Sequence, residues 1–204
     1  MNTPLRWRIH NIQCVNKSSQ GLSDKTGLDR VFLGCVPISA DGLVEHRKEF
    51  PIGLFDNVKI KRFDPPRPFV SFQIHNDRSE LGDFYICLAL FTGAAASKSM
   101  QQVYKVIDTI IKNKRAELQS PGQKPIESLS TNKIWPLVKA AVFTHMETRF
   151  SKEENTILFP IQEVTIQIPS SNHSWNDQKT SPVSEVEFRN ADGRYKLQYD
   201  WELI

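Results

Sequence analysis

The chain lacks long apolar runs and any strong excess of charge of one sign. No stretch of its 204 residues approaches the roughly 18 consecutive apolar residues of a membrane span, and the first thirty residues contain no apolar core of a signal peptide. These absences predict a soluble, cytoplasmic protein. The 26 Lys and Arg residues against 23 Asp and Glu residues give a net charge of +3, which is too small to predict a nucleic-acid partner.

Catalytic motifs and a cysteine framework are also absent. The sequence contains no G-x-S-x-G, H-E-x-x-H, Walker or G-x-G-x-x-G motif. Cys14, Cys35 and Cys87 have no C-x-x-C spacing and are predicted to be buried thiols. His10 and Cys14 could form a base and nucleophile pair, but in a strand they are more typical of a half-buried histidine beside a core thiol. We therefore expect a non-catalytic protein.

The first ninety residues show the patterns of β-strands. Apolar residues alternate from Leu5 to Ile9 and then shift phase by one at Ile12, which predicts a bulge within one strand. The segment 31–36 is apolar at every position and predicts a central strand, buried on both faces. The run Asp64–Pro68 contains three prolines and is predicted to be a rigid connector outside the sheet.

Helical patterns follow, and strands then return. Apolar residues three and four apart predict one helix from Ser97 to before Pro121 and a second over 132–150, joined as a hairpin inserted at about 93–151. Near the end, apolar residues from Tyr195 to Leu203 alternate with Lys196, Gln198, Asp200 and Glu202. This alternation predicts a central strand with one buried face and a wet opposite face; the alternative is an exposed aromatic strip.

Together these patterns predict a mainly β protein. Strands that bracket a helical hairpin favour an antiparallel β-sandwich of about eight strands over a doubly wound sheet. The length suits a single domain over residues 1–204. Because a short hairpin cannot bury its apolar stripes alone, we expect the helices to pack on the sandwich or on a partner.

An acidic, glycine-containing loop precedes the predicted central strand. The segment reads Asp24-x-x-Gly27-x-Asp29-x-Val31-Phe32. It resembles the first calcium loop of the C-two domains, a family of calcium- and lipid-binding β-sandwiches. The strand with Ile12-Gln13-Cys14 also resembles that of a group of bacterial proteins of unknown function with a similar sandwich. The resemblance covers residues 5–38, with a weaker likeness at residues 77–83.

This resemblance implies a C-two-like sandwich and a calcium site. Its candidate ligands are Asp24, Asp29, Asp77 and Asp83. The spacing of Asp24 and Asp29 is one residue shorter than in the family, Arg30 replaces a proline, and Thr92-Gly93-Ala94 lacks the paired carboxylates of a second loop. The other interpretation is that these aspartates are solvated loop residues that cap turns.

A second group of residues is basic and interleaved with phenylalanines. Such a pattern can bind anionic headgroups with inserted rings, or phosphates with stacked bases. Lysines that alternate with apolar residues also mark the solvent face of an edge strand, where they prevent strand pairing. The candidate surface-binding residues are Lys48, Lys59, Lys61, Arg62 and Arg67.

The sequence thus predicts a binding module that contacts a partner protein or a membrane surface. The contacts would be made by the end loops and the helical hairpin, since these are its distinctive surface features. One alternative is a weak calcium-dependent phospholipid-binding domain; apart from that calcium, we expect no cofactor. A second alternative is a hydrolase with an unrecognised site, which a cleft with converging histidine and aspartate side chains would indicate.

Overall fold

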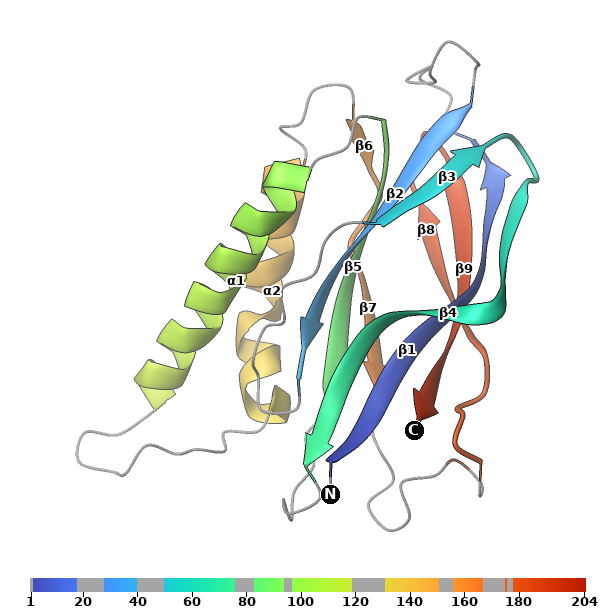
Figure 1. Cartoon of the computed structure of the whole chain (residues 1–204). Coiled ribbons are helices and arrows are strands. Elements are labelled where there is room, and N and C mark those ends of the chain that lie inside the picture. The colour runs from blue at the N-terminus through green and yellow to red at the C-terminus, as the bar shows by residue number, and fades with distance from the viewer. Residues whose placement is uncertain are drawn as a thin grey trace.

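The computed structural model describes residues 2–17, 28–39, 50–75, 83–93, 97–118, 131–150, 156–166, 175 and 178–204. These residues form nine strands and two helices (Figure 1). In chain order the elements are β1 (Asn2–Asn16), β2 (Asp29–Ile38), β3 (Phe50–Phe55), β4 (Ile60–His75), β5 (Phe84–Gly93), α1 (Ser97–Leu118), α2 (Thr131–Phe150), β6 (Thr156–Leu158), β7 (Gln162–Ile166), β8 (Ser184–Arg189) and β9 (Arg194–Leu203).

The strands form two antiparallel sheets. One sheet has the order β4-β1-β9-β8, and the other has the order β3-β2-β5-β6, with β7 also paired to β5. The two sheets pack face to face with a shared apolar core between them. The predicted antiparallel sandwich with a helical insertion is therefore confirmed, since both helices lie between β5 and β6 in the chain.

The core between the sheets is built by alternating side chains from both. In β1 the inward residues Leu5, Trp7, Ile9, Ile12 and Cys14 are all fully buried. The phase change between Ile9 and Ile12 coincides with a register shift in both ladders that β1 makes, so the predicted bulge is confirmed.

A second core lies between the helices and the outer face of the β2–β5 sheet. From the strands it contains residues such as Phe32, Val36 and Phe91, and from the helices residues such as Ile107 and Val142. The hairpin thus packs on the sandwich, on the side away from β1 and β9 (Figure 1). Within the described residues, neither helix has the length and apolar character needed to cross a bilayer.

One strand near β4 was not predicted, and one prediction there was wrong. The strand β3 was missed because Pro51 and Gly53 interrupt its apolar pattern. The run Asp64–Pro68 lies within β4 and is not a connector outside the sheet. The prolines are tolerated because β4 is an edge strand; moreover, it is bulged there, between the pairs Asn11–Arg62 and Ile9–Arg67.

The strand β9 lies between β1 and β8 and has one face in the core, as predicted. Tyr195, Leu197, Trp201 and Leu203 are buried, whereas Tyr199 is half-buried. The prediction of a wet opposite face was wrong for Asp200, which is only 3% exposed. Two side chains of β1, Arg8 and His10, contact Asp200 and bury it.

We expect Trp201→Ala to destabilise the fold by about 3–5 kcal/mol, because it removes a large side chain that is 2% exposed and stacked on Phe72. Urea unfolding followed by circular dichroism would measure this. The control is Val183→Ala, at a position that is 54% exposed, for which we expect a change below about 0.5 kcal/mol. Equal stabilities of the Trp201→Ala variant and the parent chain would contradict the assignment of Trp201 to the core.

Candidate functional site

Most of the predicted site residues lie within the described part of the chain. Asp29 begins β2, Asp83 precedes β5, and Lys61, Arg62 and Arg67 lie on β4 with Lys59 just before it. Three predicted residues, Asp24, Asp77 and Lys48, lie outside the described residues.

The two described calcium candidates lie at opposite ends of one sheet. In the β2–β5 ladder Val31 pairs with Thr92, and Ile38 pairs with Tyr85. Asp29 is therefore beyond one end of this ladder and Asp83 is beyond the other. Seven residue steps at about 3.3 Å each place these ends roughly 23 Å apart, and the two aspartates lie beyond them. Asp29 and Asp83 cannot bind the same ion.

Asp29 points into the core instead of toward solvent. Its side chain is 2% exposed, and its Oδ2 accepts a hydrogen bond of 2.7 Å from the Tyr195 hydroxyl. Burial, followed by this hydrogen bond, raises the pKa of Tyr195 far above its usual value. Since Asp29 belongs to one sheet and Tyr195 to the other, the bond ties the two sheets together.

Cys14 lies beside this pair, and its surroundings disfavour the role of a nucleophile. Burial is the main cause that raises the pKa of the Cys14 thiol to about 11, so the reactive thiolate is scarce at neutral pH. His10 does not activate it, because the His10 ring contacts Asp200 on the outer face of the sheet whereas Cys14 is in the core. The predicted structural role of this histidine and thiol pair agrees with that arrangement.

Asp83 also has a structural partner. The Tyr85 hydroxyl donates to Asp83 Oδ2 at 3.3 Å, and burial, with Asp83 as the next cause, raises the pKa of Tyr85 to about 12. Among the described residues, no three His, Cys, Asp or Glu side chains come together as metal ligands.

The basic residues gather around the turn that joins β3 to β4. This turn, residues 56–59, is fixed to the end of β1: the Cys14 N–H donates to the Lys59 carbonyl at 2.9 Å, and the Lys17 N–H donates to Asn57 Oδ1 at 2.7 Å. Val58, at the tip, has a φ of 63°. A β-branched residue in this left-handed conformation is strained, by roughly 1–3 kcal/mol.

The turn exposes two apolar side chains among cations. Val58 is 69% exposed and Ile60 is 42% exposed. Lys59 and Arg62 are exposed as well, and neither forms an ion pair within the described part of the chain. We call Val58, Lys59, Ile60, Lys61 and Arg62 the turn patch.

Aromatic rings hold two of the cations in place. The Lys61 ammonium lies 5.7 Å from the centre of the Phe63 ring, and it donates to the Ile52 carbonyl on β3. The Arg67 guanidinium lies 5.2 Å from the centre of the Phe69 ring. The Phe63 and Phe69 rings meet edge to face, with their centres 6.0 Å apart. Such cation–π contacts restrict the side chains before any ligand binds.

The outer face of the β1–β9 pair carries an ionic cluster that sequence analysis missed. Arg8 binds both carboxylate oxygens of Asp200, at 2.9 and 2.7 Å, and also Glu202 at 2.6 Å. His10 Nε2 lies 3.0 Å from Asp200 Oδ2. Burial acts to raise the pKa of Asp200, but hydrogen bonds from Arg8 and His10 lower it below its usual value.

This cluster brings together a histidine and an aspartate, as the hydrolase alternative requires. Arg8, however, occupies both oxygens of Asp200, so the carboxylate is held as one half of an ion pair. Arg8 and Asp200 carry opposite charges, but the sequence alone does not show that they are neighbours. Their pairing follows only from the register of β1 with β9. We interpret the cluster as structural.

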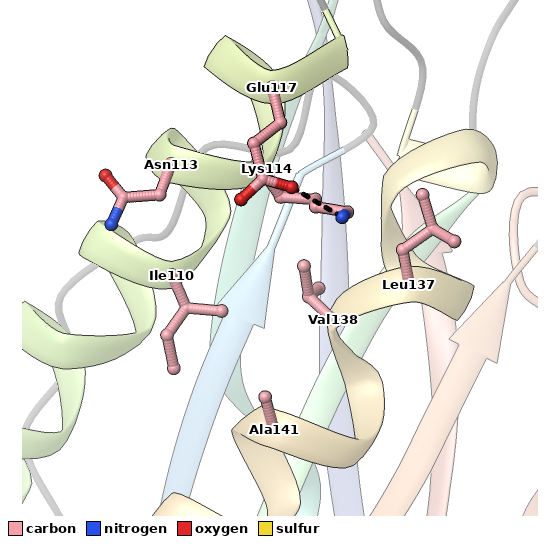
Figure 2. A pocket seen from close by; sticks show the side chains of 7 residues that line it. All are labelled: Ile110, Asn113, Lys114, Glu117, Leu137, Val138 and Ala141. Atoms are coloured by element: carbon pink, nitrogen blue, oxygen red, sulfur yellow. Dashed lines mark hydrogen bonds and ion pairs between the residues drawn. The ribbon is translucent and has the colours of Figure 1, made fainter.

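A shallow groove of about 290 Å³ lies between the two helices (Figure 2). Its apolar side is formed mainly by α2, with Leu137, Val138 and Ala141, while Ile110 comes from α1. Its polar rim is formed by Asn113, Lys114 and Glu117 of α1, and the last two form an ion pair at 2.6 Å.

We expect Tyr195→Phe to destabilise the protein by about 1–3 kcal/mol, because it leaves the buried Asp29 carboxylate without this donor. Urea unfolding at pH 7 would measure the change. Tyr199→Phe is the control, since Tyr199 lies on the same strand but is half-buried. An unchanged stability of Tyr195→Phe would contradict the structural role of the bond.

The chain was compared with protein families and with curated proteins. No family model matches the chain, and no curated protein is significantly similar to it. The function must therefore be inferred from the geometry of the described residues.

Proposed function

We propose that this protein is a non-catalytic binding module that docks on an anionic phospholipid surface through the turn patch. The observation that carries the proposal is the exposure of Val58 and Ile60 among Lys59, Lys61 and Arg62, on a turn that β1 holds in place. Apolar side chains that enter the headgroup region, flanked by cations that meet its phosphates, are the features that peripheral membrane proteins use.

The expected affinity is modest. Each Lys or Arg near an anionic surface contributes about 1 kcal/mol, and partial burial of Val58 and Ile60 adds roughly 1 kcal/mol each. The turn patch would therefore contribute about 5 kcal/mol, which corresponds to a dissociation constant of ~0.2 mM. Such binding is reversible and suits a module that uses a second contact to stay at the membrane.

Edge protection alone does not account for the turn patch. The edge of β4 is already interrupted by Pro65, Pro66 and Pro68, and Pro51 interrupts the edge of β3. Lysines are not needed there to prevent strand pairing. Edge protection also gives no reason to place Val58, strained and exposed, at the tip.

A calcium-dependent mode, which the resemblance to C-two domains implies, is the second candidate. It would need Asp24 and other carboxylates near the start of β2. Asp29 is engaged with Tyr195 there, so a calcium site would have to form without it or break that bond. Our proposal requires no calcium.

We expect the double variant Lys59→Glu/Arg62→Glu to lose binding to vesicles that contain phosphatidylserine. The loss of two cations predicts an affinity at least about 30-fold lower. Sedimentation with vesicles of phosphatidylcholine, with and without phosphatidylserine, would measure it, in chelator and in calcium.

The matched control is Lys105→Glu/Lys179→Glu, which makes the same change of charge at two exposed lysines outside the patch. Binding that appears only with calcium would favour the calcium-dependent mode. If the parent chain does not sediment with either vesicle, or both double variants lose binding equally, the proposal is wrong.

We expect Val58→Gly to stabilise the fold and to weaken membrane binding. Glycine adopts a positive φ without strain, so the unfolding free energy should rise by about 1 kcal/mol. The loss of the apolar side chain should lower vesicle affinity by roughly threefold to fivefold. Urea unfolding and vesicle sedimentation of the same variant would test both effects, and unchanged vesicle binding would exclude Val58 from the contact.

A further inference from the structure

The middle of β4 arches away from its neighbour strand. Arg62 pairs with Asn11 of β1. Arg67, five residues later, pairs with Ile9, which is only two residues away from Asn11, and residues 63–66 have no partner in this ladder. The extra residues must therefore bulge outward, where β4 bends in its middle (Figure 1). We use the name proline arch for Pro65, Pro66, Arg67 and Pro68.

The sequence restricts the backbone of the proline arch to extended conformations. Each proline ring holds φ near about −65°. Pro65 and Arg67 each precede a proline, which keeps them out of the helical region. These are the conformations of the polyproline II helix, which has about three residues per turn. Pro65 and Pro68 are three residues apart, so their rings share one side of such a segment.

The proline arch is open to solvent and held at its base. Pro65, Arg67 and Pro68 are exposed, whereas Pro66 is half-buried. Phe63 precedes the arch and Phe69 follows it, and their rings meet edge to face. Because Phe69 is buried in the core, this contact fixes both ends of the arch to the sandwich. The prolines are thus ordered before any partner binds, which lowers the entropic cost of docking.

Edge protection does not require this number of prolines. One proline already removes a hydrogen-bond donor from an edge strand and prevents pairing there. Pro68, which pairs with Arg8 of β1, stands where that protection is useful. Pro65 and Pro66 lie where β4 has already left the ladder. Edge protection also gives no reason for an exposed arginine between the prolines.

We propose that the proline arch docks into the aromatic groove of a partner domain that recognises polyproline II segments, as SH3 domains do. Such grooves receive two prolines separated by two residues between their aromatic rings. Pro65 and Pro68 have this spacing. The exposed guanidinium of Arg67 selects a groove with acidic residues at its rim. This inference goes beyond membrane docking, and the turn patch includes none of these residues.

The probe for the experiment is an isolated, isotope-labelled SH3 domain that binds P-x-x-P peptides with an adjacent arginine. The unlabelled full-length protein would be titrated into it while the amide and indole resonances of the SH3 domain are followed. We expect shifts confined to the aromatic groove and its acidic rim. The dissociation constant should increase with salt, because part of the attraction is between charges. A P-x-x-P peptide that fills the groove should displace the protein.

Pro65→Ala/Pro68→Ala should lower the affinity for the SH3 domain at least about tenfold, because both rings leave the groove. The matched control is Pro51→Ala/Pro182→Ala, which makes the same change at two exposed prolines outside the arch and should bind as the parent chain does. Arg67→Gln keeps all three prolines and should lower the affinity about threefold. Vesicle sedimentation of the Pro65→Ala/Pro68→Ala variant should match the parent chain, so failure of this proposal is distinguishable from failure of membrane docking.

Three results would overturn the proposal. They are no binding of the parent chain, shifts outside the groove without displacement by the peptide, and equal binding of a folded Pro65→Ala/Pro68→Ala variant. Self-association of that variant together with equal binding would assign the prolines to edge protection alone. If its circular dichroism spectrum differs from that of the parent chain, the Arg67→Gln variant and the displacement by the peptide decide the test.

Discussion

The fold depends on burying both faces of the β2–β5 pair. Along β2, Val31, Leu33 and Cys35 face the other sheet, while Phe32 and Val36 face the helices. β5 alternates in the same way, and nearly all side chains of the two strands are buried. A sheet that is apolar on both faces needs a cover on each. One cover is the β4-β1-β9-β8 sheet, and the other is the helical hairpin.

This constraint also explains why the helical hairpin packs on the sheet. Two helices of about twenty residues have marginal stability alone and gain most of it from the face that they bury. Tyr104 fixes α1 to the sheet, because its hydroxyl donates to the Cys35 carbonyl at 2.6 Å. Trp135 fixes α2, because its indole N–H donates to Glu163 at 3.1 Å. With the inner faces anchored, outer side chains such as Leu137 and Val106 remain exposed.

Sequence patterns predicted the elements whose signal is local. The two-sided apolar run of β2, the phase shift in β1 and the alternation of β9 each follow from spacing along the chain. The features missed depend on distant partners or on backbone conformation. Asp200 is buried by Arg8, which is 192 residues away in sequence, and Asp29 is drawn inward by Tyr195. Nothing in the sequence marks Val58 for a positive φ.

The same backbone contacts that build the sandwich also fix the turn patch in place. The end of β1 binds the turn through Cys14 and Lys17, while Lys61 joins β4 to β3 across the edge of the sandwich. Ordering a mobile loop would cost about 1–2 kcal/mol per residue, and such ordering opposes binding. A turn that is already fixed avoids that cost. For the docking that we propose, weak electrostatic and apolar contacts would therefore be sufficient, and the fixed turn holds Val58 in its strained conformation.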